Sequence, residues 1–203
     1  MKTTADMVLP QAIPQFPQHA GRRLCAWLLH HCGWHMLGAF PDQPRLVLIA
    51  APHTSWWDGV WGLLFKVALG LDLVFLGKRE LFHGPLGWTL RRLGGIPIDR
   101  ASPHGVVEQM VERFQGSRCL WVGMAPQGTR KQVGHWRTGF WQIAHAAGVP
   151  ILPVAFDYPS RTITLGGLFQ PSDDMEADVA ALQRFYAPFQ GRRVRRESSE
   201  PAP

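Results

Sequence analysis

Short apolar segments alternate with helical segments along most of this chain, and this alternation constrains the fold more than any other feature of the sequence. The apolar segments typical of buried strands span 46–51, 73–77, 96–99, 119–125, 149–156 and 161–166. The segments predicted as helices span 56–69, 84–94, 103–115, 136–147 and 175–189. Strands that alternate with helices predict an α/β fold: a single layered domain with a mixed, largely parallel sheet flanked by helices.

The two ends of the chain differ from this central region. Residues 1–19 are predicted to be a flexible N-terminal arm, which three prolines interrupt and which lacks the apolar stretch of a signal peptide. The domain is predicted to span 20–190, with 20–39 as its first helix. That helix either lies in a membrane interface or packs on the core, since three histidines blur its apolar face. Residues 191–203 are predicted to be a disordered basic tail, which either contacts lipid headgroups or is only a solubilising end.

Charge and cysteine content restrict the classes of function. The formal net charge of +6 favours an anionic partner, such as a phosphorylated substrate or an anionic membrane surface. We expect no nucleic-acid partner, because the aromatic residues do not interleave with basic ones in a recognisable motif. Three cysteines without a C-x-x-C pair argue against a disulfide framework or a thiolate zinc site, so we expect no metal and a reducing, cytoplasmic compartment. No stretch reaches the ~18 apolar residues of a transmembrane helix, so we expect a soluble or peripheral protein.

The stretch APHTSWWDG (51–59) follows the apolar segment 46–51 and carries a histidine and an aspartate five residues apart. Ligands of parallel sheets gather at the carboxyl ends of strands. The chain can turn after Pro52 and begin a helix near Asp58, so that the carboxylate contacts one imidazole nitrogen of His53. This contact would fix the tautomer and leave the other nitrogen as a general base for a hydroxyl. The alternative is a hydrogen bond that only stabilises the turn.

Basic residues follow other predicted strands. Arg100 follows one strand, Arg130 follows the Gly128-Thr129 pair after another, and Lys78 follows 73–77. Together these side chains would form an anion pocket near His53, and the planar guanidinium suits phosphate because it can bond two oxygens. Each residue also has a simpler interpretation, as part of a surface ion pair or of a solvated turn.

The order of these segments resembles the glycerolipid acyltransferase family, typified by bacterial 1-acylglycerol-3-phosphate acyltransferases. The resemblance spans about 45–158 and rests on H-x4-D at His53 and Asp58, GIPIDR (95–100), PQGTR (126–130), VPILPV (149–154), and the Lys-x-Glu-Leu piece within LGKRELF (76–82). It implies a glycerol-3-phosphate acyltransferase-like fold. It also implies transfer of a fatty acyl group from acyl-CoA or acyl-ACP to the hydroxyl of a lysophospholipid acceptor, such as 1-acylglycerol-3-phosphate.

The family resemblance implies a role for each matched residue. His53 would be the general base and Asp58 its orienting partner, with no acyl-enzyme and no cofactor beyond the thioester co-substrate. Arg100 and Arg130 would hold the acceptor's phosphate, and Lys78, Gln127 and Thr129 would contact the substrate beside them. Backbone amides near Gly128 would stabilise the oxyanion. The protein would work as a peripheral enzyme at the anionic cytoplasmic face of the inner membrane.

One residue departs from the family pattern. Members usually carry Phe-Pro-Glu-Gly-Thr-Arg, whereas this chain has APQGTR (125–130), with Gln127 in place of the glutamate. Gln127 keeps the size and one acceptor oxygen but loses the negative charge and gains an NH2 donor. Two alternatives follow: an acyltransferase for a non-phosphate acceptor, such as an aminolipid or a polyene, or an inactive lipid-binding relative.

Overall fold

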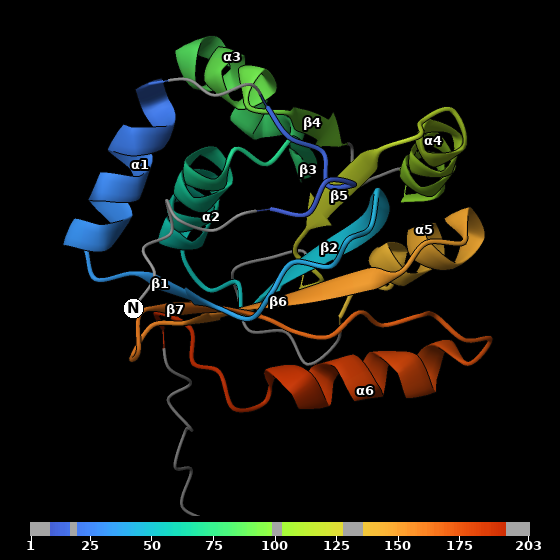
Figure 1. The fold of residues 1–203 in the computed structure, drawn as a ribbon. Helices are drawn as coiled ribbons and strands as arrows, with labels where there is room; N and C mark the ends of the chain where they lie inside the picture. Colours follow the sequence, from blue (N-terminus) through green and yellow to red (C-terminus); the bar gives the residue numbers. More distant parts are fainter. Residues whose placement is uncertain (1–8, 17–19, 99–102, 128–135, 194–203) are drawn as a thin grey trace, which may run out of the picture.

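A computed structural model describes residues 9–16, 20–98, 103–127 and 136–193 of the chain. In this part of the protein, seven strands form one sheet in the order β1-β7-β6-β2-β5-β3-β4 (Figure 1). Neighbouring strands run parallel except β6 and β7, which are antiparallel. Helices cover both faces of the sheet. The predicted fold class, a layered α/β domain with a mixed, largely parallel sheet, is therefore confirmed.

The elements follow the alternation seen in the sequence. The strands are β1 His35–Leu37, β2 Arg45–Ala51, β3 Leu73–Lys78, β4 Gly95–Ile98, β5 Leu120–Met124, β6 Ile151–Asp157 and β7 Thr162–Leu165. The helices are α1 Ala20–His31, α2 Trp56–Leu69, α3 Gly84–Arg92, α4 Pro103–Gln115, α5 Gly139–Ala147 and α6 Met175–Tyr186, with a 3-10 turn, η2, at Arg79–Phe82. Helix α5 ends at Gly148, whose φ of 63° is the left-handed conformation that glycine adopts without strain.

The central strand β2 divides the apolar residues into two cores. Leu46 packs toward α1 and α2, whereas its neighbour Val47 and then Ile49 pack toward α4, α5 and α6. Successive side chains of a strand point to opposite faces, so one short apolar segment serves both layers. Figure 1 shows α1 and α2 on the opposite side of the sheet from α6. Because β2 is covered on both faces, its sequence is a continuous apolar run.

The prediction of one helix over 20–39 is wrong in its second half. Helix α1 ends at His31, and β1 then pairs in parallel with Thr162–Thr164 at the edge of the sheet. The chain turns at Gly33, which has a φ of 73°, and Trp34 is buried. A three-residue edge strand carries almost no periodicity of its own, since only its pairing partner defines it.

The N-terminal segment 9–16 packs on the side of the sheet that carries α1 and α2. Residues 9–16, part of the predicted N-terminal arm, include the buried Ile13, and the N–H of Phe16 donates to the carbonyl of Gly70 (2.8 Å). Residues 194–203 of the predicted basic tail lie outside the described residues.

Candidate active site

The loop between β2 and α2 holds the histidine and the aspartate at the carboxyl edge of the sheet. Ser55 is the N-cap of α2, and Asp58 lies in the first turn of that helix. The Oδ2 atom of Asp58 accepts the backbone N–H groups of Thr54 and Ser55, each at 2.7 Å. This capping arrangement satisfies amides that the start of a helix leaves without partners, and it fixes the position of the carboxylate.

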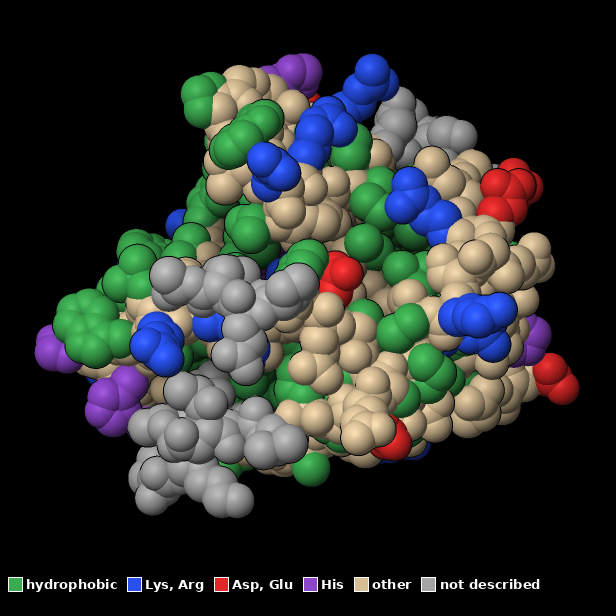
Figure 2. All heavy atoms as spheres, turned by 45° about the horizontal axis from the view of Figure 1, so that its top comes forward, with side chains coloured by type: hydrophobic (Ala, Val, Ile, Leu, Met, Phe, Trp, Pro, Cys, Tyr) green, Lys and Arg blue, Asp and Glu red, His purple; other side chains and the backbone are tan. Residues whose placement is uncertain are grey.

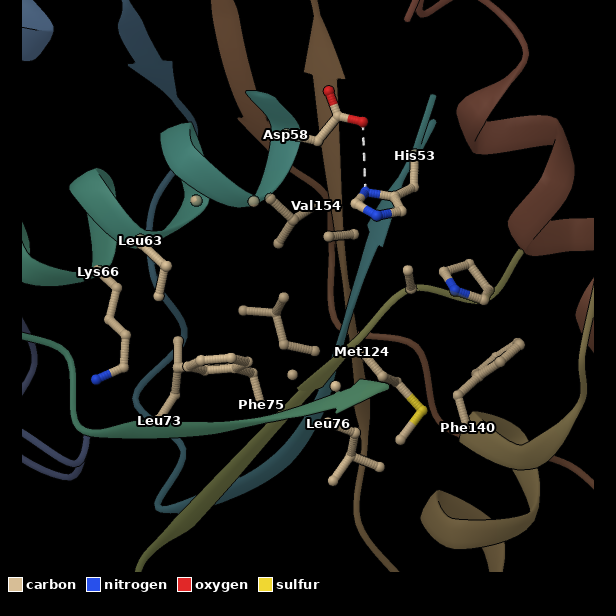
Figure 3. A pocket seen from close by; sticks show the side chains of 18 of the residues that line it. His53, Asp58, Leu63, Lys66, Leu73, Phe75, Leu76, Met124, Phe140 and Val154 are labelled. Atoms are coloured by element: carbon tan, nitrogen blue, oxygen red, sulfur yellow. Dashed lines mark ion pairs between the residues drawn. The ribbon is translucent and has the colours of Figure 1, made fainter. Parts of the chain in front are cut away.

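His53 lies against this buried carboxylate. Its Nδ1 is 3.3 Å from Oδ2 of Asp58 (Figure 3). The Asp58 side chain is fully buried, whereas 29% of the His53 side chain is exposed. Because Asp58 contacts Nδ1, the nitrogen that faces a substrate hydroxyl would be Nε2. The predicted contact between the two residues is present, and it adds to the capping role of Asp58 and does not replace it.

Tyr158, which the sequence interpretation missed, completes the environment of Asp58. Its hydroxyl donates to Oδ1 of Asp58 at 2.5 Å. Burial, together with this hydrogen bond, raises the pKa of Tyr158 well above its ordinary value, so the phenol stays protonated and remains a donor. Tyr158 directly follows β6, which pairs with β2. In the sequence, only its position just after an apolar segment could have indicated that it lies near Asp58. Both carboxylate oxygens of Asp58 are thus engaged.

Gln127 also contacts the loop. Its Oε1 accepts the backbone N–H of His53 at 2.6 Å. The acceptor oxygen that a glutamine shares with a glutamate is therefore the atom used here, and this contact needs no negative charge. Gln127 was predicted to bind substrate, which stays a prediction; the structure shows a contact that positions the backbone of His53.

The chain after α6 returns over the same loop. The N–H of Arg193 donates to Oγ1 of Thr54 (3.4 Å), and the guanidinium of Arg192 lies 5.1 Å from the ring of Trp57. Gly191 lies so close to Thr54 that a Cβ on this glycine would be 2.5 Å from Oγ1. The segment 191–193 therefore packs against the loop that carries His53 and against the first turn of α2.

The predicted anion pocket is only partly described. Lys78 ends β3 and lines the same cavity as His53, and its Nζ lies 2.9 Å from Oε1 of Glu80, with about half of the Lys78 side chain exposed. Arg100 and the piece Gly128, Thr129 and Arg130 lie outside the described residues. Within the described ranges, no cluster of three or more His, Cys, Asp or Glu side chains is placed to hold a metal ion.

A cavity of about 1040 Å³ opens beside His53 and Asp58 and continues under α2. Most of its lining is apolar and comes from α2, β3, β5 and β6, as shown by Leu63, Leu73, Phe75, Leu76, Met124 and Val154 in Figure 3. A large, mostly apolar cavity with a histidine in its lining suits a hydrocarbon chain whose reactive end lies at that histidine.

Comparison with known proteins places this arrangement in a family. The Acyltransferase family model matches residues 35–157. The chain is 30% identical over 148 residues to a 1-acyl-sn-glycerol-3-phosphate acyltransferase of Streptococcus pneumoniae, covering 71% of this chain and 53% of that protein. It is 36% identical over 123 residues to the protein of the same name from Pseudomonas aeruginosa, covering 57% of this chain and 45% of that protein. The chain thus spans about half the length of the curated relatives it matches.

A solved structure shows the same fold. The crystal structure of the 1-acyl-sn-glycerophosphate (LPA) acyltransferase PlsC from Thermotoga maritima superposes with a TM-score of 0.58 at 18% identity, covering 81% of this chain and 74% of that one. The region matched by the family model, 35–157, contains strands β1 to β6 and the loop that carries His53. Because the family model matches more than half of the chain, the chain belongs to the glycerolipid acyltransferase family.

Proposed function

We propose that this protein is an O-acyltransferase that moves a fatty acyl group from an acyl thioester to the hydroxyl of a lysophospholipid acceptor such as 1-acylglycerol-3-phosphate. The observation that carries the proposal is the His53–Asp58 pair at one end of the large apolar cavity. The names of the matched relatives support the acceptor class. The thioester of coenzyme A or of acyl carrier protein serves as co-substrate, and the mechanism needs no other cofactor.

The chemistry follows from the pair. The acceptor hydroxyl oxygen attacks the thioester carbonyl carbon while Nε2 of His53 takes the hydroxyl proton. Asp58, held by two backbone amides and Tyr158, keeps the imidazole oriented and stabilises the imidazolium that forms. When the tetrahedral intermediate collapses, the C–S bond breaks, the new ester C–O bond remains, and the thiolate takes the proton from His53. No acyl-enzyme forms in this sequence of steps.

The surface around the site supports work at an anionic membrane, which we place at the cytoplasmic face of the inner membrane. Large apolar side chains are exposed on three helices near the cavity: Leu24, Trp27, Trp56, Trp57, Val60, Leu86 and Trp88. Figure 2 shows hydrophobic side chains exposed beside Lys and Arg side chains on the side that carries α1 and α3. Tryptophan with neighbouring cations suits the headgroup region of a bilayer.

No helix in the described ranges is long and apolar enough to cross a membrane.

Release of free thiol by the purified protein tests the function. Long-chain acyl-CoA and acyl-ACP are each supplied with lysophospholipids, glycerol-3-phosphate or lyso-aminolipids, with and without anionic vesicles. We expect acceptor-dependent release that His53→Ala abolishes. His145→Ala is the matched control, because His145 also pairs with a carboxylate, Asp173 at 3.2 Å, but does not line the cavity. Turnover that persists in His53→Ala would refute the mechanism.

The acceptor panel also decides between the phosphate acceptor and the two alternatives. Gln127 supports an active enzyme, because its oxygen makes the His53 contact that a glutamate oxygen can make. Release with lyso-aminolipids but not with 1-acylglycerol-3-phosphate would instead identify a non-phosphate acceptor. No release with any acceptor, combined with retained lipid binding, would identify an inactive relative.

A further inference from the structure

A short strap, residues 190–193, links the end of β6 to the loop between β2 and α2. Its first residue is held at the end of β6: the N–H of Gln190 donates to Oδ1 of Asp157 (3.0 Å), and its carbonyl accepts the N–H of Tyr158 (2.9 Å). Both backbone groups of Gln190 are therefore held by two consecutive residues of the chain. The strap thus starts from a fixed point beside the phenol that donates to Asp58.

The strap then packs directly on Thr54, the residue that follows His53. A Cβ on Gly191 would lie 2.5 Å from Oγ1 and 2.7 Å from Cγ2 of Thr54, closer than a Cβ comes to another side chain. The N–H of Arg193 donates to the same Oγ1 (3.4 Å), and Thr54 itself is 3% exposed. Only a residue without a side chain can approach this buried threonine so closely, which makes glycine a requirement at position 191.

The two anchor points of the strap are also the two residues that orient the carboxylate of Asp58. The backbone N–H of Thr54 donates to Oδ2 (2.7 Å), and the hydroxyl of Tyr158 donates to Oδ1. Oδ2 is the atom that lies against Nδ1 of His53. A shift of the strap would move these two donors relative to each other and would turn the carboxylate away from the imidazole.

The strap adds little to the apolar core. Arg192 and Arg193 are exposed, and Gly191 has no side chain to bury. The guanidinium of Arg192 lies 5.1 Å from the ring of Trp57, so this contact reaches the first turn of α2. Because hydrophobic burial is the main source of stability in a domain, a segment with these contacts influences the geometry of the loop more than the free energy of unfolding.

We propose that the strap is a positioning element for acyl transfer and that Gly191 is its main positioning residue. By joining Tyr158 to Thr54, the strap holds both donors in place on the Asp58 carboxylate. The carboxylate in turn keeps the proton of the neutral imidazole on Nδ1 and leaves Nε2 of His53 free to take the proton of the acceptor hydroxyl. The effect of the strap on turnover rests on the proposed function, whereas its effect on the imidazole does not depend on turnover.

The tautomer of His53 tests the proposal without turnover. Nitrogen-15 NMR of the imidazole, assigned by comparison with His53→Ala, reports which ring nitrogen carries the proton in the neutral form. We expect the Nδ1–H form in wild type and a mixture with the Nε2–H form in Gly191→Ala, because the added Cβ displaces Thr54. Gly167→Ala is the matched control, since Gly167 also lies in a loop and a Cβ there meets no described atom within 4 Å. A His53 signal in Gly191→Ala that is identical to the wild-type signal would overturn the proposal.

Thiol release measures the consequence for turnover. Gly191→Ala should lower kcat by roughly tenfold to a hundredfold, as for a small misplacement of a catalytic group, while the KM for the acceptor changes by less than about twofold. Thr54→Ala in the Gly191→Ala background removes both atoms that would lie within 3.0 Å of the new Cβ, so the double variant should recover part of the lost kcat. An unchanged kcat in Gly191→Ala, or no recovery in the double variant, would contradict the proposal.

Thermal unfolding separates a local effect from a loss of folded protein. We expect the melting temperature of Gly191→Ala to stay within about 4 °C of wild type, because the strap buries little apolar area. A fall in melting temperature large enough to account for the lost activity would show that the strap has only a structural role. If wild type releases no thiol with any acceptor, the proposed function fails, and the NMR comparison still decides whether the strap holds His53.

Discussion

The hydroxyl of Tyr158 donates to Oδ1 of Asp58, the oxygen that does not contact His53. The other oxygen, Oδ2, accepts from the loop amides and lies against Nδ1 of His53. Two oxygens of one carboxylate thus have separate tasks. Tyr158 fixes the rotation of the carboxylate, which in turn fixes the direction of the imidazole.

Tyr158→Phe is expected to lower the free energy of unfolding by about 1–3 kcal/mol, because it leaves one oxygen of a buried carboxylate without its donor. It should lower kcat while the KM for the acceptor changes little, since Tyr158 acts through Asp58 and not on the substrate. Tyr186→Phe is the matched control: its buried hydroxyl donates to the Ile49 carbonyl and does not contact Asp58. If both variants lose stability but keep the same kcat, Tyr158 has only a structural role.

Gln127→Glu is expected to keep turnover within a few-fold of wild type, because the carboxylate oxygen can accept the His53 N–H as the amide oxygen does. Gln127→Ala removes that acceptor and should lower both kcat and the free energy of unfolding, the latter by about 1 kcal/mol. Thiol release and chemical denaturation measure the two effects. Activity that appears only in Gln127→Glu would instead mean that wild type has lost its chemistry.

The buried Lys66 predicts a pH dependence of stability with a definite sign. Its pKa is about 8 in the folded protein and near 10.5 when solvated, so between these values the unfolded chain binds more protons. The free energy of unfolding of wild type should therefore rise with pH over this range relative to Lys66→Met. Below pH 8, Lys66→Met should exceed wild type in the free energy of unfolding by the largest amount, because wild type then buries a charge. As the pH rises, this difference should narrow by roughly 3 kcal/mol at most. Denaturant titrations from neutral to alkaline pH measure this difference, and a gap that stays constant would contradict it.

Membrane binding is expected to depend on the exposed tryptophans near the site. Trp27→Ala and Trp57→Ala should each lower partitioning onto anionic vesicles by several-fold to about tenfold, because each removes apolar area that would leave water. Added salt should weaken the binding further. Cosedimentation with vesicles measures both effects.

Leu168→Ala is the control for this prediction. Leu168 is also exposed, but it lies next to Phe169, which pairs with Ile151 at the opposite end of β6 from the site. A loss of binding in Leu168→Ala equal to that in the tryptophan variants would show that a different surface meets the membrane.

Some parts of this site were predictable from single segments of the sequence. The apolar run of β2, the serine cap and the aspartate in the first turn of α2 all lie within residues 45–58, so local chemistry defines them. The contact between His53 and Asp58 follows from that local geometry, whereas the alternation of strands and helices predicts the α/β class but not the order of the strands in the sheet. The edge strand β1 was not predictable, because its three residues gain their structure only from pairing with β7.

The sequence by itself determined the α/β class, most element boundaries and the His53–Asp58 pair, because these depend on short-range periodicity, capping and turn chemistry. Only the tertiary structure decided that Tyr158, one hundred residues from Asp58, supplies its second hydrogen bond, and that Gln127 holds the backbone of His53. It also decided that Lys66 is buried, since a lysine in an apolar helix is equally compatible with a solvent-facing position. Such contacts depend on which strands become neighbours in the sheet and on which segments close the cavity, and no local pattern encodes that pairing.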